Sequence, residues 1–239
     1  MVPNDTKAYR DGGNVQMTHI MGATHLPVDT PEDSALKTLK EEGKNPYWIP
    51  SGASLHPLGG LGYARCAFEI AQQEKAMFGA EAGFGVIVVP TASGSTLAGL
   101  VAGFKAVDQG AGLKNKKKRR LIGVLAAPKD KKDFAVMVLD IARTAAKLIG
   151  VEPESITESD FEIDDRWSAG QYGKLDDGTK EGIKLLASVE GVITDPVYSG
   201  KALTGTLEMV RKGEIGAGEK VLFLHTGGIG SVSAYEGLR

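Results

Sequence analysis

The chain has a single cysteine, Cys66, and no long run of apolar residues. One cysteine excludes an intrachain disulfide framework and a cysteine-rich metal site, so we predict no metal centre and a reducing compartment, the cytoplasm. Because no apolar stretch approaches about 20 residues, we expect no membrane-spanning helix and no membrane partner. The N-terminus, MVPNDTKAYRDGGN, is polar and lacks the apolar segment of a signal peptide.

An excess of charge of either sign is also missing. The 28 basic and 30 acidic residues leave a net charge of −2, which gives no electrostatic reason to expect nucleic acid as a partner. One basic cluster, residues 114–120, lies between a predicted helix and an apolar strand, which favours a solvated surface loop. Nucleic-acid binding through this cluster is the alternative interpretation.

What the chain does contain is typical of a soluble α/β protein: 239 residues, 42% of them hydrophobic, and 32 glycines suited to tight connections. Residues 1–50 predict two helices and two short strands with too little apolar surface for a core of their own. These helices are expected at 14–21 and from Thr30 or Asp33 to Gly43, and these strands at 26–28 and 47–49. We therefore expect an incomplete small α/β domain over residues 1–50 and a large α/β domain over residues 51–239.

From about residue 59 onward, helices and strands alternate. Apolar residues at helical spacing predict helices near residues 64–71, 97–107, 131–148, 183–189 and 201–211. Short apolar, β-branched runs predict strands at residues 85–89, 121–126, 191–194 and 220–224. A polar loop at 152–181 interrupts this order, and ordered loops of that length are commonly functional. Such alternation predicts an α/β fold with a mostly parallel twisted sheet flanked by helices.

The most informative stretch is FGVIVVPTASGSTLAGLVAGFKAV, residues 84–107. Here an apolar strand, ended by Pro90, leads through a turn of small hydroxyl and glycine residues, 91–96, into a helix. Helix N-termini carry free N–H groups and partial positive charge that bind anions, and small residues let the backbone approach the anion. The turn matches neither GxGxxG nor GxxxxGK[ST], and the alternative is an ordinary connection whose Ser and Thr cap the helix.

Polar or glycine-rich residues follow three of the predicted strands, at 91–96, at 195–200 (DPVYSG) and at 225–228 (HTGG). Ligands of parallel sheets bind beyond the carboxyl ends of the strands, so we expect these three loops to form one site. The glycine-rich segment 51–62 (SGASLHPLGGLG) is interpreted as a connection between domains, with a direct ligand contact as the alternative.

Several motifs carry a resemblance to a known family. The segments TASGSTLAG, DPVYSGKALTG, LHTGGIGSVSAY, IPSGASLHPLGGLGY and GGNVQMTHIMGA resemble the family of 1-aminocyclopropane-1-carboxylate (ACC) deaminases and D-cysteine desulfhydrases. The resemblance covers nearly the whole chain. It implies the tryptophan synthase β-like fold, called fold type II, with pyridoxal 5'-phosphate as cofactor, a small amino acid as substrate, and a homodimer.

The resemblance also implies roles for individual residues. Most of them would contact the cofactor: its phosphate at Ser93, Gly94, Ser95, Thr96 and Leu97, its pyridine nitrogen at Ser199, and its ring at Thr226 and Gly227. Tyr198 would lie beside the substrate as an acid/base or carboxylate-positioning group, or else simply cap the core as a strand-end aromatic. Tyr172 matches a second family aromatic near the substrate, although its surroundings, SAGQYGKLDD, depart from the more usual YGVPN.

Ser199 and Thr226 favour the desulfhydrase branch of this family. The resemblance implies a glutamate at position 199 in ACC deaminases, where it would keep the pyridine nitrogen protonated, and a small hydroxyl residue in D-cysteine desulfhydrases. With a hydroxyl beside its nitrogen, the cofactor is a weaker electron sink. That still suffices for removing an α-proton and expelling a good leaving group such as sulfide. We therefore predict a pyridoxal-phosphate-dependent lyase that converts D-cysteine into pyruvate, ammonia and hydrogen sulfide, with ACC deamination as the alternative.

One departure from the family pattern bears on activity. The family's cofactor-binding lysine lies in a GGNKxRK motif and a catalytic serine in a following GGxQSNxxR motif, whereas Gly12-Gly13-Asn14 is followed here by Val15. Lys201 lies in DPVYSGK, but the family does not use it for this purpose. We therefore expect a chain truncated at its N-terminus and inactive alone, whose first 50 residues pack poorly. A non-catalytic protein that retains only the phosphate site or an interface is the alternative of another class.

Overall fold

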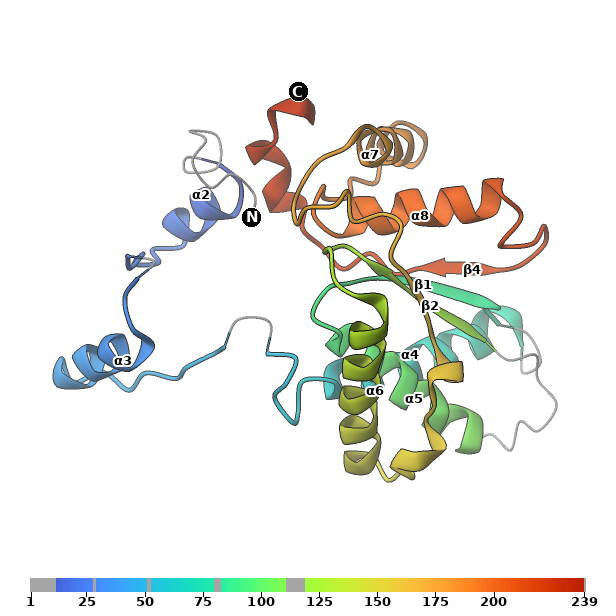
Figure 1. The fold of residues 1–239 in the computed structure, drawn as a ribbon, viewed down its shortest axis with the longest axis horizontal. Coiled ribbons are helices and arrows are strands. Elements are labelled where there is room, and N and C mark those ends of the chain that lie inside the picture. The colour runs from blue at the N-terminus through green and yellow to red at the C-terminus, as the bar shows by residue number, and fades with distance from the viewer. Residues whose placement is uncertain (1–11, 28, 51–52, 80–82, 111–118, 239) are drawn as a thin grey trace.

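The computed structural model describes residues 12–27, 29–50, 53–79, 83–110 and 119–238 (Figure 1). Its first helices and strands are α2 (Gly13–Ile20), α3 (Glu32–Glu41), α4 (Leu61–Phe78), β1 (Val86–Thr91), α5 (Ser95–Gly110), β2 (Arg120–Leu125) and α6 (Lys131–Leu148). The remaining ones are η1 (Pro153–Ser155), η2 (Glu158–Asp160), β3 (Glu162–Asp164), α7 (Asp177–Glu190), α8 (Ser199–Arg211), β4 (Val221–Phe223), η3 (Ile229–Ala234) and η4 (Glu236–Leu238). Within these residues, no helix is both long and apolar enough to cross a membrane.

The four strands form one parallel sheet in the order β3-β2-β1-β4. Helices α4, α5 and α6 lie on one side of the sheet, and α7 and α8 on the other (Figure 1). Successive residues of β1 alternate between the two cores: Ile87 packs with the first group of helices and Val88 packs with α8. The sheet is therefore buried on both faces, which confirms the expected α/β architecture.

Glycines set how closely α5 approaches its neighbours. A Cβ atom added at Gly99 would overlap the carbonyl oxygen of Gly60, just before α4, and one added at Gly103 would overlap that of Ala64 on α4. In β2, a Cβ at Gly123 would collide with the side chain of Leu97, which is fully buried in the first turn of α5. These contacts fix the position of α5, and with it the turn that precedes the helix.

Pro90 lies inside β1 rather than ending it, and it pairs with Val124 of β2. Even-numbered residues of β1 face β4, as the hydrogen bond from Leu224 N to Val88 O shows. The pairing with β4 stops at Phe223, opposite Val88. Because the side of Pro90 that lacks an N–H faces a region beyond this pairing, the strand continues without losing a sheet hydrogen bond.

Other local predictions were wrong for a shared reason: an apolar run needs a partner strand. Residues 191–194 and 47–49 are not strands, and Tyr47 remains 85% exposed. Leu26 and Pro27 are not in a strand either, and Val28 lies outside the described residues. Conversely, the predicted loop 152–181 contains β3 and the first turn of α7, because pairing with β2 makes a strand of three residues.

Two further details differ from the helical predictions. Helix α3 begins after Pro31, without a side-chain cap from Thr30 or Asp33. Helix α4 buries Ala64, Ala67, Ile70 and Glu74, whereas Phe68, inside the predicted apolar helix 64–71, is exposed. Glu74 can be buried because Arg119 donates to both of its carboxylate oxygens, at 3.0 and 2.7 Å. Residues 114–118 of the basic cluster lie outside the described residues, whereas Arg120 pairs with Glu162.

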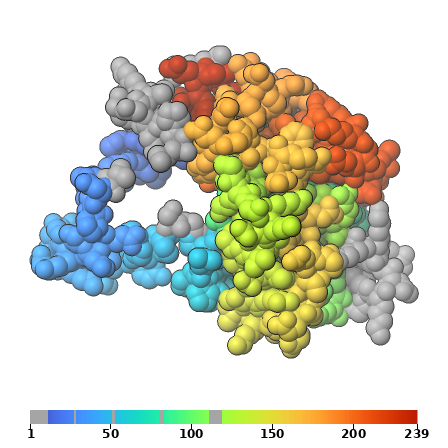
Figure 2. Space-filling model, viewed as in Figure 1, coloured from blue at the N-terminus to red at the C-terminus, as the bar shows by residue number. Residues whose placement is uncertain are grey.

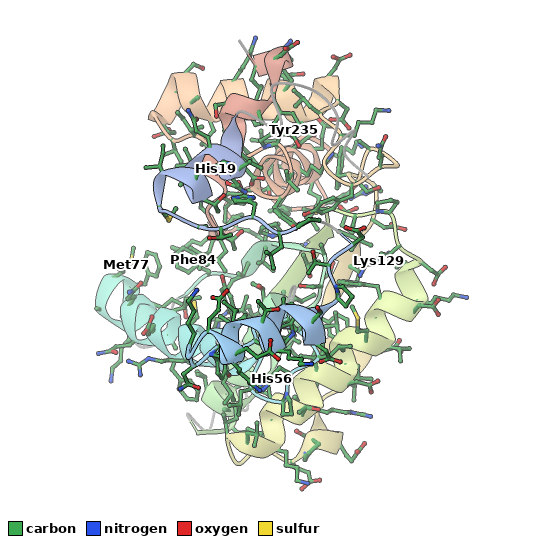
Figure 3. All side chains as sticks on the ribbon, turned by 90° about the vertical axis from the view of Figure 1, so that its left-hand side faces the viewer. His19, His56, Met77, Phe84, Lys129 and Tyr235 are labelled. Atoms are coloured by element: carbon green, nitrogen blue, oxygen red, sulfur yellow. The ribbon has the colours of Figure 1, made fainter. Side chains whose placement is uncertain are left out.

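The described residues before 50 have little core. Helix α3 contains no buried residue, and α2 buries only Gly13, whose N–H donates to Ser233 Oγ at 3.0 Å. Figures 1 and 2 show α3 standing apart from the body of the molecule. In Figure 3, His19 marks α2 and Tyr235 marks the C-terminal segment that packs beside it. This is the poor packing expected of the segment, while the division into two domains stays a prediction.

Candidate functional site at the C-terminal edge of the sheet

The turn between β1 and α5 places a helix N-terminus at the C-terminal edge of the sheet. Gly94 has a φ of +95°, and Ala98 N donates to Gly94 O at 2.9 Å, which starts the helix. A Cβ at Gly94 would lie 3.3 Å from Ile141 Cδ1, so α6 supports the turn from one side. Ser93 is exposed, and Ser95 and Thr96 are half-buried in the first turn of α5, where backbone N–H groups have no intrahelical acceptor.

The segment 53–60 contacts this turn directly. Ser54, buried in the loop, donates a hydrogen bond from its hydroxyl to Ser95 Oγ at 3.2 Å. Ala53 before it has a φ of +43°, the left-handed region that residues other than glycine seldom adopt. The sequence favoured a domain connection here, so Ser54 is a site residue that the prediction missed. The signals for it were the loop's glycine-rich composition and its place in the motif IPSGASLHPLGGLGY.

Asp195 organises the second loop, 195–199. Its carboxylate is 1% exposed and accepts hydrogen bonds from Val197 N (2.8 Å), Tyr198 N (2.9 Å) and Ser199 N (2.7 Å). It also accepts from Ser199 Oγ at 2.6 Å. Asp195 therefore fixes the backbone that precedes α8 and the orientation of the Ser199 hydroxyl. The Asp-Pro pair in the sequence signals such a turn, yet the prediction assigned Asp195 no role.

The third loop meets the second through Ser199 and Gly227. Ser199 is fully buried, and its hydroxyl lies 3.3 Å from Gly227 O. Gly227 N donates to His225 Nδ1 at 3.1 Å, which leaves Nε2 to donate to Ile193 O at 2.9 Å. Residues 193–199 thus lie beside the end of β4 although they do not follow a strand. Thr226 is exposed and Gly227 is half-buried.

Tyr172 and Tyr198 meet although 26 residues separate them in the chain. Their hydroxyl groups are hydrogen-bonded to each other, and their rings lie edge to face with centroids 5.7 Å apart. Tyr172 is 36% exposed and lies between Gly170 and Gly173, both with positive φ. The structure therefore brings the two predicted substrate-side tyrosines together, next to Ser199.

Buried polar groups set the electrostatics of this edge. Lys201 follows Ser199 in α8, is 0% exposed, and donates from Nζ to Lys174 O at 2.8 Å. Burial lowers the pKa of Lys201, while Asp176 and Asp195 act in the opposite direction. The hydroxyls of Thr91 and Thr194 are buried without a hydrogen-bond partner among the described residues. Thr91 ends β1 and Thr194 precedes Asp195, so unsatisfied polar atoms occur next to two of the three loops.

The described residues offer no group of three or more His, Cys, Asp or Glu side chains that could hold a metal ion. What the edge does provide is a helix N-terminus rich in hydroxyls, a pair of phenols and a buried Ser–Asp pair. This donor set is suited to an anionic, phosphate-bearing ligand and to proton transfer or carboxylate binding beside it.

Comparisons with known proteins agree with this description. A family model described as "Pyridoxal-phosphate dependent enzyme" matches residues 1–227. An ACC deaminase from Pseudomonas syringae pv. syringae (strain B728a) is 41% identical over 233 residues, covering 93% of this chain and 64% of the relative. One from Burkholderia multivorans is 38% identical over 242 residues, covering 98% of this chain and 68% of the relative.

A solved structure shows the same fold. The crystal structure of an ACC deaminase homologue has a TM-score of 0.71 and 34% sequence identity with this chain. The match covers 92% of this chain and 63% of the solved chain. The chain thus spans about two thirds of the length of the relatives it matches.

Proposed function

Because the chain belongs to the family of pyridoxal-phosphate dependent enzymes, we propose that it forms the cofactor-phosphate site and the substrate-side tyrosines of a lyase that deaminates ACC. Relatives named ACC deaminase, 37–41% identical over most of this chain, support ACC as the substrate. This preference reverses the order of the two substrates expected from Ser199 and Thr226. The observation that carries the proposal is the meeting of the Tyr172–Tyr198 pair with Ser199, at the edge where α5 begins.

The residues present fit the phosphate end of the cofactor. Ser93, Ser95 and Thr96 bring hydroxyls to the N-terminus of α5, and the buried Thr91 hydroxyl, which has no hydrogen-bond partner among the described residues, ends the preceding strand. The positive φ of Gly94 turns the backbone there without a side chain in the way. Such a site binds a phosphate through backbone N–H groups, the helix dipole and hydroxyl donors.

Pyridoxal phosphate, when bound, supplies an electron sink for the bonds at the substrate's α-carbon. The chain's own residues then have distinct tasks in the proposal. Ser199 would meet the pyridine nitrogen: its proton is directed to Asp195 Oδ1 (2.6 Å) and one lone pair accepts from Asp195 N (2.9 Å), which leaves the second lone pair as an acceptor. Tyr198 and Tyr172 share one hydrogen bond, so either phenol can hold a substrate carboxylate or move a proton.

The Ser199–Asp195 pair also bears on the choice of substrate. A serine backed by a buried carboxylate can accept a hydrogen bond from a protonated nitrogen, as a glutamate would. The hydroxyl at position 199 is therefore compatible with ACC as well as with D-cysteine. β-Elimination of D-cysteine remains the second candidate because position 199 carries a small hydroxyl and Thr226 follows His225, as the resemblance implies for desulfhydrases.

Binding of the phosphate group tests the first part of the proposal. Calorimetric titration should show pyridoxal 5'-phosphate binding about tenfold or more tightly than pyridoxal, because charge-assisted contacts to phosphate are strong. Ser95→Ala should weaken binding of the phosphate form and leave pyridoxal unchanged. Ser34→Ala on the exposed helix α3 is the matched control. Equal affinities for the two compounds would refute the phosphate site.

Because the chain lacks the GGNKxRK motif and is expected to be inactive alone, substrate choice is measured on a cofactor-loaded version extended by the family's lysine-bearing segment. Release of ammonia from ACC, with no sulfide from D-cysteine, supports the first candidate, and sulfide release from D-cysteine supports the second. Tyr198→Phe should abolish most of either activity, whereas Tyr47→Phe on the exposed N-terminal segment should leave it unchanged. The proposal includes a homodimer, which analytical ultracentrifugation of the same sample tests.

A further inference from the structure

Lys201 is the one fully buried lysine side chain among the described residues, at 0% exposure. Lysine is rarely buried completely, because removing its ammonium group from water is costly unless polar groups replace the solvent. Here Nζ donates to Lys174 O at 2.8 Å, and the carboxylates of Asp176 and Asp195 attract its charge. A lysine buried in the first turn of α8 cannot contribute to the solubility of the surface, so its burial needs another explanation.

The hydrogen bond from Lys201 joins the same two chain segments as the tyrosine pair. Tyr198 precedes Lys201 by three residues, and Tyr172 precedes Lys174 by two. The two tyrosine hydroxyls are hydrogen-bonded to each other, and the hydrogen bond from Lys201 to Lys174 O is a second link between the same two chain segments. One buried side chain thus connects α8, which carries Tyr198, to the loop that carries Tyr172.

The loop needs such tethers because its own sequence specifies its conformation weakly. Gly170 and Gly173 have positive φ, and glycine is the residue with the largest conformational freedom to lose on folding. Two successive carbonyl groups of the loop accept side-chain hydrogen bonds: Tyr235 Oη donates to Gly173 O at 2.7 Å and Lys201 Nζ to Lys174 O. Of these two donors, only Lys201 is fully buried and charged.

We propose that Lys201 is a positioning residue that fixes the 170–176 loop against α8, so that Tyr172 is held in contact with Tyr198. The inference rests on the proposed function, since the position of Tyr172 matters to catalysis only if this pair faces the substrate. Lys201 itself acts through the carbonyl of Lys174 and does not serve as the amine that binds the cofactor.

Trypsin gives a direct test, because the carbonyl that Lys201 binds is the one that trypsin must attack at Lys174–Leu175. Lys201→Met removes the donor while keeping most of the side-chain volume. Cleavage after Lys174 should become about tenfold faster, the effect of losing one hydrogen bond from a charged donor. Cleavage after Lys147, in the core helix α6, reports global unfolding and should not change. Lys184→Met, on the exposed face of α7, is the matched control.

Circular dichroism near 280 nm tests whether the tyrosine pair depends on Lys201. Tyr172→Phe removes the hydroxyl contact, and Lys201→Met should remove a similar part of the tyrosine signal. The double variant should show no further loss, because both changes disrupt one pair. A role of Lys201 in overall stability alone would leave this signal intact below the unfolding transition.

The outcomes separate this inference from the proposed function, because neither measurement requires cofactor or substrate. Unchanged cleavage after Lys174, or an additive loss of tyrosine signal in the double variant, overturns the role of Lys201. Failure to bind pyridoxal phosphate overturns the proposed function alone. If Lys201→Met does not fold, Lys201→Gln is measured instead, since its shorter amide cannot reach Lys174 O, and the same results support or overturn the inference.

Discussion

Replacing Asp195 with asparagine should destabilise the protein far more than a change of one atom type suggests. Each carboxylate oxygen of Asp195 accepts two hydrogen bonds in an environment that is 1% exposed. Asparagine keeps one acceptor oxygen and presents an NH₂ group to the other two donors. Leaving two buried donors unsatisfied costs about 1–3 kcal/mol each, so we expect a loss of about 2–6 kcal/mol in the free energy of unfolding.

Asp130→Asn is the matched control for this measurement. Asp130 caps α6 through one exposed carboxylate oxygen, which accepts from Lys132 N at 2.8 Å and Asp133 N at 3.0 Å. Asparagine is as good an N-cap as aspartate, so the same substitution should change the free energy of unfolding there by about 0.5 kcal/mol or less.

Urea unfolding at pH 7, followed by circular dichroism, gives both free energies under the same conditions. A total loss of about 2–6 kcal/mol would be a large share of the roughly 5–15 kcal/mol typical of folded proteins. Similar small effects for the two variants would refute the assignment of Asp195 as the residue that organises the 195–199 turn. In that case the turn would be held by the backbone contacts of α8 instead.

Three further predictions concern other parts of the molecule. Gly94→Ala should weaken pyridoxal-phosphate binding and cost about 1 kcal/mol or more in stability, because φ is +95° there. Gly62→Ala, in open space on α4, should instead stabilise the protein by about 0.5–1 kcal/mol. Calorimetry measures cofactor binding, and urea unfolding measures the stability of both variants. Burial raises the pKa of Asp164, but hydrogen bonds from Arg166 and Trp167 outweigh it and lower the pKa below 3.8. Its stabilisation is therefore present above that value and lost as pH falls through the lower folded-state pKa, so Asp164→Asn should flatten the decline of stability at acid pH, measured by urea unfolding. Borohydride reduction of the protein mixed with pyridoxal phosphate should leave Lys201 unmodified in peptide mass spectra, and a cofactor adduct on Lys201 would contradict its assignment as a tether.

Long periodic elements and the sheet could be predicted from the sequence because their signals are local. Helix α6 occupies residues 131–148 as expected, since its apolar residues repeat at helical spacing and Asp130 caps it. The parallel sheet followed from the alternation of helices and strands. Strand β3 was not predicted because the apolar–polar alternation of residues 161–164 is only four residues long, lies in a polar segment, and becomes a strand through pairing with β2. Residues 191–194 are the opposite case: their apolar run predicted a strand, but they have no partner strand to pair with.

The candidate site was predictable where its loops follow strands, as 91–96 and 225–228 do after β1 and β4. Loop 195–200 was expected beside them for a wrong reason, since residues 191–194 are not a strand, yet the Ser199–Gly227 and Tyr172–Tyr198 contacts join residues named in advance. Ser54 could not be predicted, because its contact with Ser95 spans 41 residues and depends on how two loops pack. Asp195 and Lys201 were in recognised motifs, but their buried hydrogen bonds are a property of the folded structure.

Different kinds of interaction hold the turn before α5 and the tyrosine pair, so substitutions should affect these two parts of the site differently. Apolar packing holds the turn before α5, since Leu97 is buried against Gly123 and Gly94 against α6. The tyrosine side is held instead by buried polar groups, Asp195 and Lys201, whose hydrogen bonds are directional. A cavity such as that left by Leu97→Ala should lower global stability by about 2–5 kcal/mol, while loss of the Lys201 donor should loosen one loop and leave the core folded. Binding of the cofactor phosphate and the geometry of the tyrosine pair are therefore separable properties of this chain.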